Sequence, residues 1–278
     1  MSGPLPGPQP GPRRDTRGIV DAPELFARVR FRRRAPAPAL RPYLEHYWLI
    51  DWDLAEPHVS RVVPHPSVNI VFQRFGDSPA FGEVAGVGLG LFTQRLTGVG
   101  AVCGIQFRPG GFRPFVPDRP VAEWTGRRVP LPEVFPDSAA WPADILTPSD
   151  EDARVAALDR FLLSPAPEPD PQAGRAMALV DRVRTDRTMR RVEELAAGEG
   201  VSARSLQRLF TSYVGVSPKW VILRYRIHEA LERAEEDKTV DWAALAAELG
   251  YSDQAHLTRD FTATIGVTPA AYGAAPRP

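Results

Sequence analysis

Arginine, glutamine and threonine side chains recur with matching spacing at two places near the C-terminus. Residues 205–211 read Ser-Leu-Gln-Arg-Leu-Phe-Thr, and residues 256–262 read His-Leu-Thr-Arg-Asp-Phe-Thr. Arg208 and Arg259 hold equivalent positions, 51 residues apart (259 against 208). Arginine and glutamine can form bidentate hydrogen bonds with guanine and adenine, and threonine can contact bases or phosphates. The chemistry that this pattern favours is therefore recognition of base edges in DNA.

Each copy also carries an apolar stripe that predicts a helix behind these polar side chains. The stripe residues are Leu206, Leu209, Phe210 and Tyr213 in the first copy and Leu257, Phe261 and Ile265 in the second. The predicted DNA contacts beside the stripes are Arg204, Gln207, Arg208, Thr211, Gln254, His256, Thr258 and Arg259. One such polar face is typical of any solvated helix. Two at a fixed offset indicate one supersecondary unit used twice.

Residues that begin and end helices flank both copies. Ser202 and Asp253 are the predicted N-caps, and Pro218 and Pro269 follow capping hydroxyls at the start of the next helices. Short apolar-faced helices are expected before the copies, with Gly198 and Gly250 in the turns. The inward residues of a long helix at 218–234 are expected to be Trp220, Leu223, Ile227, Ala230 and Leu231. The sequence thus predicts two helix-turn-helix units joined by a rigid helical spacer.

A set of spaced motifs extends this pattern over roughly residues 175 to 275. The motifs are Arg226–Leu231, Ala243–Leu249, Gly250–Gln254, Leu257, Arg259, Phe261, Gly266 and Thr268–Tyr272. Together they resemble the signature of the AraC/XylS transcription regulators. One departure is Gly273, where the family commonly has Arg, which puts one phosphate contact in doubt. The resemblance implies an all-α domain that binds double-stranded operator or promoter DNA, with RNA polymerase as a further candidate partner.

Length and composition bound these expectations. The chain has 278 residues, with 34 basic and 34 acidic side chains and a net charge of zero. This balance predicts moderate, salt-sensitive DNA affinity, and the length predicts two domains. The single Cys103 excludes an internal disulfide and suits a reducing cytosol. No stretch approaches a membrane span, so we expect a cytoplasmic protein without membrane contact.

Changes in composition divide the chain into successive segments. They are a Pro/Gly-rich disordered tail at 1–17, an N-terminal sensor or dimerisation domain at 18–163, a Pro-rich linker at 164–174 and the DNA-binding domain at 175–275. Alternation in the N-terminal domain predicts strands near 48–54, 68–72 and 99–107, a short helix from Pro114 and a closing helix at 150–163. The expected fold of this domain is α+β, with a mainly antiparallel sheet that can curl into a barrel.

The N-terminal half carries a second group of motifs, Tyr47–Leu54, Arg61–Pro64, Val68–Phe72 and Gly104–Phe112. They resemble an uncharacterised domain that is often joined to AraC-type regulators. The resemblance implies a part that senses a small-molecule effector or forms a homodimer. The aromatic residues that could line a pocket are Trp48, Trp52, Phe72 and Phe107, although plain core is the more frequent role at such alternation.

Catalytic, cofactor and metal sites find little support in the residue types. Gly86–Gly90 lacks the spacing of a dinucleotide-binding loop. His58, His65 and Cys103 lack the short spacing of metal ligands. We therefore expect no enzyme activity, no cofactor and no metal.

The leading hypothesis is a sequence-specific transcription regulator of the AraC/XylS type, controlled through its N-terminal domain by a small molecule or a second protomer. The alternative is a small-molecule-binding or enzymatic N-terminal domain joined to a degenerate DNA-binding module. Loss of Arg208 and Arg259, or polar residues in the apolar stripes, would favour the alternative. Neither change is present.

Overall fold

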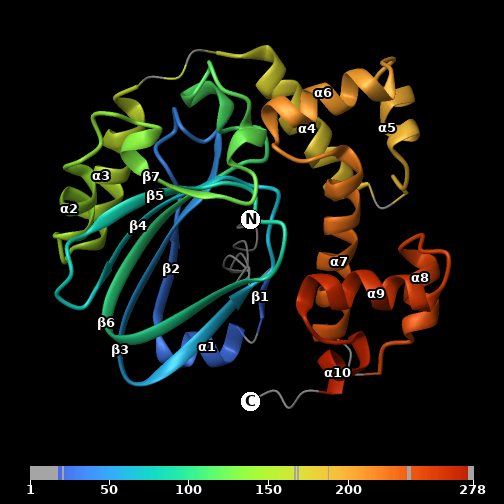
Figure 1. Cartoon of the computed structure of the whole chain (residues 1–278), viewed down its shortest axis with the longest axis horizontal. Helices are drawn as coiled ribbons and strands as arrows, with labels where there is room; N and C mark the ends of the chain where they lie inside the picture. Colours follow the sequence, from blue (N-terminus) through green and yellow to red (C-terminus); the bar gives the residue numbers. More distant parts are fainter. Residues whose placement is uncertain are drawn as a thin grey trace, which may run out of the picture.

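The computed structural model of the chain describes residues 18–20, 22–165, 167, 169–186, 188–236 and 239–274, without the side chains of 235 and 236 (Figure 1). The tail predicted at 1–17 lies outside the described residues, as do positions 166 and 168 of the predicted linker. Within those ranges, no helix combines the length and the apolar character needed to cross a bilayer.

The N-terminal part is built on one antiparallel sheet of seven strands. The strands are β1 (Ile19–Val20), β2 (Arg30–Arg34), β3 (Leu44–Val62), β4 (Asn69–Phe75), β5 (Phe81–Ala85), β6 (Phe92–Phe107) and β7 (Arg128–Pro130). Their order is β1-β3-β6-β4-β5-β7, and β2 also pairs with β3. The two longest strands, β3 and β6, pair along most of their length. The prediction of an α+β domain with a mainly antiparallel sheet is confirmed.

The sheet stays open instead of closing into a barrel. Among the described residues, β7 pairs only with β5 at one edge, and β1 and β2 pair only with β3 at the other. Closure requires the two edges to pair with each other. Here the edge strands are short and leave few backbone groups to pair, β7 having 3 residues and β2 having 5. The predicted option of a barrel is therefore wrong.

One face of the sheet carries the main hydrophobic core. Alternate residues of β6, from Ala101 to Phe107, point into it together with Leu49 and Phe72. The helices α2 (Trp141–Leu146) and α3 (Glu151–Leu163) contribute to this core, and Phe161 packs edge-on against Phe72 with ring centroids 5.4 Å apart. Three short 3-10 helices complete this side: η1 (Arg113–Phe115), η2 (Val121–Trp124) and η3 (Leu131–Glu133). The predicted short helix at Pro114 is η1.

The opposite face of the sheet has a smaller apolar cluster. Trp52, Val71 and Val102 are buried there, with Trp48 packed beside them. The helix α1 (Ala22–Arg28) covers part of this face through Leu25. The remaining part of the face is open toward the C-terminal helices.

The C-terminal part is entirely helical, as the sequence predicts. Its helices are α4 (Pro171–Thr185), α5 (Val192–Gly198), α6 (Ala203–Tyr213), α7 (Pro218–Glu236), α8 (Trp242–Glu248), α9 (Gln254–Ile265) and α10 (Pro269–Ala274). In Figure 1, α7 runs between an upper group, α4 to α6, and a lower group, α8 to α10. The Asp170 carboxylate caps α4 by accepting from the backbone N–H of Gln172. Helix α4 thus begins inside the stretch predicted as linker.

The first helical group shares its core with the N-terminal part. Apolar residues of α4, α6 and α7 belong to the same buried cluster as the core face of the sheet. Two polar contacts reinforce this junction: the Thr125 hydroxyl donates to the Gly215 carbonyl at 2.6 Å, and Arg108 pairs with Asp181 at 2.5 Å. The second group has its own cluster, to which the N-terminal part contributes only Val20, Val63 and Leu91 among the described residues.

Candidate nucleic-acid interface and adjoining cavity

The first helix-turn-helix unit consists of α5, a turn and α6. Gly200 adopts a left-handed φ of 63° in the turn, and the next N–H, from Val201, donates to the Ala196 carbonyl at 3.0 Å. The Ser202 hydroxyl caps α6 by accepting from the N–H of Ser205 at 3.1 Å. The sequence placed Gly198 in this turn. That was wrong, because Gly198 ends α5 and the left-handed position falls on Gly200.

The second unit repeats this geometry in α8, a turn and α9. Gly250 has a φ of 74°, and Tyr251 N–H donates to the Ala246 carbonyl at 2.9 Å. The Asp253 carboxylate caps α9 by accepting from His256 N–H at 2.7 Å, and this hydrogen bond holds the pKa of Asp253 below its usual range. The first helices begin at 192 and 242, whereas the second helices begin at 203 and 254. The turn of the second unit is therefore one residue longer.

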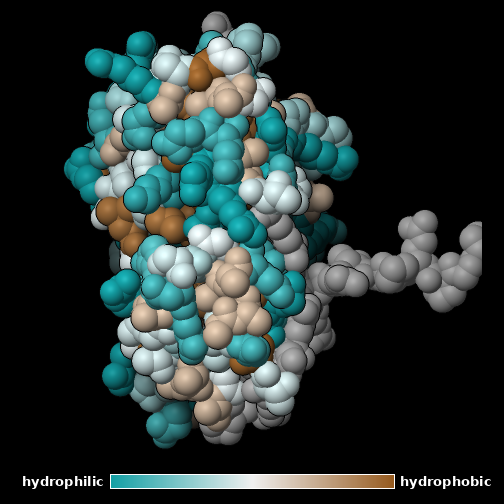
Figure 2. All heavy atoms as spheres, turned by 90° about the vertical axis from the view of Figure 1, so that its right-hand side faces the viewer, coloured by the Kyte–Doolittle hydropathy of each residue, from teal (hydrophilic) through white to brown (hydrophobic). Residues whose placement is uncertain are grey.

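The predicted contact residues of α6 lie on its solvent face. Leu206 and Phe210 are buried on the opposite side of the helix. The exposed residues are Arg204, Gln207, Arg208 and Thr211. In the described part of the chain, Arg204 and Arg208 have no carboxylate partner, so both guanidinium groups are available to an external acceptor. Figure 2 shows the side of the molecule formed by the C-terminal helices, and hydrophilic residues cover much of it.

The predicted contact residues of α9 divide into two groups. Gln254 and Arg259 are exposed, while Thr258 and His256 are half-buried. The His256 ring lies edge-on to Tyr251, with centroids 5.0 Å apart, and its Nδ1 is 3.3 Å from the Ser252 hydroxyl. This histidine thus packs within its own unit, and its contact with DNA stays a prediction.

The long helix α7 connects the two units, and a side-chain cap stabilises its first turn. The Ser217 hydroxyl accepts from Trp220 N–H at 3.1 Å, as the predicted cap requires. Ile227, Ala230 and Leu231 are buried, while the predicted inward residues Trp220 and Leu223 are only partly buried. Sequence reasoning missed Val221 and Ile222, which are buried in the core shared with the N-terminal part. Their position on α7 gave no sign of a second packing partner.

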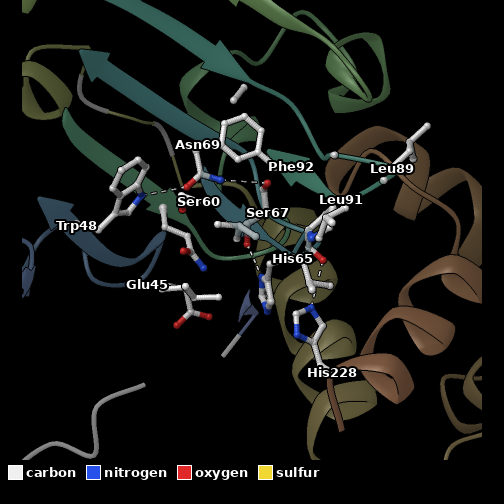
Figure 3. Close-up of a pocket in the computed structure, with 18 of the residues that line it drawn as sticks. Glu45, Trp48, Ser60, His65, Ser67, Asn69, Leu89, Leu91, Phe92 and His228 are labelled. Atoms are coloured by element: carbon white, nitrogen blue, oxygen red, sulfur yellow. Dashed lines mark hydrogen bonds between the residues drawn. The ribbon is translucent and has the colours of Figure 1, made fainter. Parts of the chain in front are cut away.

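A cavity of about 880 Å³ lies between the open face of the sheet and the C-terminal helices (Figure 3). Its lining combines residues of β3, β4 and β6 with residues of α7. From the sheet these include Trp48, Ile50, Asn69, Val71, Phe92, Val102 and Gln106. From α7 they include Ile222, Tyr225, Arg226, His228 and Glu229. We call this space the sheet–α7 cavity.

Polar contacts join the loop between β3 and β4 to α7 at this cavity. His65 Nδ1 lies 2.8 Å from the Ser67 hydroxyl, and His65 Nε2 lies 3.2 Å from the Tyr225 hydroxyl. On the next turn of α7, His228 Nε2 donates to the Pro64 carbonyl at 3.2 Å. Figure 3 shows His65, Ser67 and His228 gathered on one side of the cavity. Loop 64–67 is therefore tied to the helix that carries both units.

A buried arginine makes a second connection at the cavity rim. Arg224 of α7 donates through Nη2 to the Leu89 carbonyl at 3.1 Å and lies 4.5 Å from the centre of the Trp220 ring. Its side chain is 5% exposed, and burial lowers its pKa to about 10. The glycine-rich stretch Gly86–Gly90, which the sequence excluded as a dinucleotide loop, thus forms part of the cavity wall and contacts α7.

The four aromatic residues singled out in the N-terminal half separate onto the two faces. Trp48 and Trp52 line the cavity, whereas Phe72 and Phe107 lie in the main core. Sequence reasoning did not single out Asn69 or Gln106, and it considered His65 only as a metal ligand. Polar residues in strands usually face solvent, and only the C-terminal helices turn this face into an enclosed one.

The three residues considered as metal ligands have different surroundings. Cys103 is fully buried in the main core, where burial raises the pKa of its thiol to about 12. His58 Nδ1 lies 3.6 Å from Glu24, while His65 faces the cavity. Among the described residues, no three side chains from His, Cys, Asp and Glu gather as a metal site.

Comparison with known families agrees with this division of the chain. Residues 195–275 match a family described as a helix-turn-helix domain, and residues 32–130 match a domain of unknown function. These helices define the C-terminal part as a helix-turn-helix DNA-binding domain. The C-terminal part is thus an AraC-type helix-turn-helix domain, and the N-terminal part carries the domain of unknown function.

Distant likeness to solved structures is also present. A structure of ToxT from Vibrio cholerae is 10% identical, with 78% of this chain and 97% of that chain covered and a TM-score of 0.39. A second ToxT structure is 9% identical, with coverage of 88% and 96% and a TM-score of 0.41. A third, of ToxT with an unsaturated fatty acid bound, is 11% identical, with coverage of 88% and 94% and a TM-score of 0.36. A likeness this distant carries no argument about ligand or activity. No curated protein matches the chain significantly.

Proposed function

We propose that this chain is a sequence-specific transcription regulator whose DNA binding is controlled by a small molecule in the sheet–α7 cavity. The single observation that carries the proposal is the shared lining of that cavity. Its walls come both from the N-terminal sheet and from α7, the helix that joins the two helix-turn-helix units. A compound bound there contacts the DNA-binding part directly.

The DNA-reading surface of the proposal consists of the exposed faces of α6 and α9. Arg208 and Arg259 are the proposed base readers, since each occupies the middle of its helix on the face opposite the buried stripe. The flanking contacts proposed for bases or phosphates are Arg204, Gln207, Thr211, Gln254, His256 and Thr258. The two helices would read sites about one helical turn, roughly 10 base pairs, apart.

Control by the cavity requires that a ligand binds two states of the regulator with different affinity. The contacts that define those states are available in the structure: Tyr225 and His228 bond to the loop that carries His65 and Pro64, and Arg224 bonds to Leu89. A ligand that displaces either wall strains or releases these hydrogen bonds. Since α7 holds both units, the distance or angle between α6 and α9 would change with it.

The experiment has two steps. Genomic fragments retained by the purified chain would be sequenced to find the operator, and gel shifts on that operator would measure affinity with and without compounds that raise the thermal stability of the chain. Binding of a ligand to the folded state must raise that stability. Expected is a compound that both stabilises the chain and changes operator affinity. Failure to retain any specific fragment would favour the alternative, a binding or enzymatic N-terminal domain with a degenerate DNA-binding module.

The remaining assignments complete the proposal. The domain limits are 18–163 and 175–275, the compartment is the cytoplasm, and RNA polymerase is the partner through which an activator would work. Homodimerisation through the N-terminal domain is the competing mode of control. Sedimentation of the full chain separates the two, because a tight dimer that no compound alters would assign control to protein concentration.

A further inference from the structure

The floor of the sheet–α7 cavity has an unusual construction. Trp48 and Trp52 of β3 stand directly opposite Gly104 and Gly100 of β6 in the strand register. A Cβ atom added to Gly104 would overlap the Trp48 indole, and one added to Gly100 would overlap the Trp52 indole. Both indoles therefore lie across β6, in the space that side chains would otherwise occupy. Glycine inside a strand weakens it, and often marks a place where another group approaches the backbone closely.

The polar atoms of both indoles are used inside the protein. Trp48 Nε1 donates to the Asn69 side-chain oxygen at 3.4 Å, and Trp52 Nε1 donates to the Thr97 carbonyl at 3.3 Å. The two rings differ in solvent exposure: Trp52 is 4% exposed in the cluster with α1, while Trp48 is half-buried. Trp48 consequently offers the cavity an aromatic face and no free donor. Figure 3 shows its ring beside Asn69 at the sheet.

Neutral hydrogen-bonding groups adjoin this face. Gln106 lies next to Asn69 in the register of β6 and β4, and both line the cavity. The Gln106 side chain is half-buried and makes no hydrogen bond with the described residues, so its amide can both donate and accept. The cavity lining around this set includes Arg33, which stands opposite Trp48 in the register of β2 and β3. It also includes Arg184, which pairs with Asp181 at 2.8 Å and Glu45 at 3.7 Å. Trp48, Asn69 and Gln106 thus form an aromatic and uncharged set within a cavity that charged residues also line.

We propose, building on the cavity function above, that the effector is a planar aromatic compound whose ring stacks on Trp48 and whose polar edge bonds to Gln106 and Asn69. Aromatic rings prefer offset-stacked or edge-to-face contacts, which add to the gain from burial alone. A flat platform with its own N–H already engaged is suited to a ring. The neutral amides suit a hydroxyl, carbonyl or amide on the ring's edge.

A matched pair of probes tests the ring requirement. 2-Naphthol and decahydro-2-naphthol share a carbon skeleton and a hydroxyl, but only the first is flat and aromatic. Binding of each to the full chain would be measured by calorimetry and by the rise in thermal midpoint. Expected is binding of 2-naphthol about five- to tenfold tighter than that of its saturated counterpart. The preference should vanish in Trp48→Leu, persist in Trp48→Phe and weaken in Gln106→Leu.

Trp141→Leu is the matched control, because Trp141 is half-buried in α2 against Phe161 and lies outside the cavity lining. It should bind 2-naphthol like the unaltered chain, and Gln106→Leu, in which the preference should weaken, keeps the test valid if Trp48→Leu does not fold. Equal affinity for the two probes, or a preference that survives in Trp48→Leu or is unchanged in Gln106→Leu, overturns the ring assignment while leaving a cavity that binds ligands. Failure of the chain to bind any compound overturns the cavity function itself, independently of ring chemistry.

Discussion

The two helix-turn-helix units have nearly the same local geometry and very different surroundings. The first is built into the core of the N-terminal part, with Val121 of η2 close to Gly215 and the Thr125 hydroxyl bonded to its carbonyl. The second has a separate hydrophobic cluster centred on Leu257 and Phe261. The first unit is therefore fixed to the sheet, and the second is held mainly through α7. Under the proposed function, a ligand that moves α7 repositions the second unit against a stationary first one.

The largest expected difference between the units appears when each loses its central phenylalanine. Phe210→Ala and Phe261→Ala should each cost about 3 to 5 kcal/mol, since both rings are fully buried. Phe210→Ala should accelerate hydrogen exchange in α6 and also in 113–124 of the N-terminal part. Phe261→Ala should accelerate exchange only in 242–274. If Phe261→Ala also accelerated exchange in the N-terminal part, the second unit would share a core with that part as the first unit does.

DNA binding gives the next largest effect. Arg208→Ala and Arg259→Ala should each weaken operator binding by about 1 to 3 kcal/mol, because each removes a bidentate contact with a base. Each should relax preference at a different base pair, about 10 base pairs apart. Quantitative gel shifts on single-base variants of the operator measure both quantities. Glu193→Ala, on an exposed surface of α5, is the control. Unchanged affinity in both arginine variants would remove these residues from the reading surface.

A smaller effect tests the junction of the first unit with the sheet. Thr125→Val removes the hydrogen bond to the Gly215 carbonyl and should cost about 1 kcal/mol. Proteases should then cut more readily between Ser164 and Gly174, where the proposed boundary of the helical part lies. Thr185→Val removes a comparable hydroxyl bond, to Asp181, at an exposed site and serves as the control. Identical cleavage rates in the two variants would contradict a role of Thr125 in joining the parts.

The smallest expected effect is a difference in pH dependence between the N-caps of α6 and α9. The hydrogen bond from His256 N–H holds the pKa of Asp253 below the ordinary carboxyl range, whereas the equivalent cap in the first unit is the hydroxyl of Ser202. Stabilisation from Asp253 is therefore present above the carboxyl's unfolded-state pKa and is lost as pH falls through its lower folded-state value. Asp253→Ser should remove this acid sensitivity from α9 while leaving α6 unchanged. Helicity of the second unit, followed by NMR between neutral and acid pH, measures it; an unaltered titration would exclude the cap as its source.

The sequence specified the helical part in detail because its signals are local. Caps, turn glycines and apolar stripes each depend on residues within a few positions of one another, so Ser202, Asp253, Phe210 and Phe261 took their expected places. The extra residue in the second turn escaped notice because the comparison of copies used one constant offset. That offset holds after the turn and not before it.

The cavity was beyond reach of the same reasoning because it depends on pairing between distant strands. Alternation assigned Trp48 and Phe72 to strands but not to faces, and both were equally plausible as core. Only the register shows Trp48 opposite Gly104, and only the position of α7 encloses the face that carries Asn69 and Gln106. Whether the sheet closes likewise depends on pairing between its edge strands. Short apolar runs in the sequence do not predict that pairing.

The paired tryptophans and glycines have a consequence for how this site can change over generations. Any side chain at position 104 would displace the Trp48 ring, and a smaller residue at position 48 would leave a groove over Gly104. A substitution at either position alone therefore changes the shape of the cavity. The same constraint joins 52 to 100. Descendants of this chain that keep the same ligand should inherit both pairs together, whereas a change of ligand should appear as coordinated replacement at sites some fifty residues apart (104 against 48). Joint variation at these four positions would thus classify related chains by the shape of what they bind.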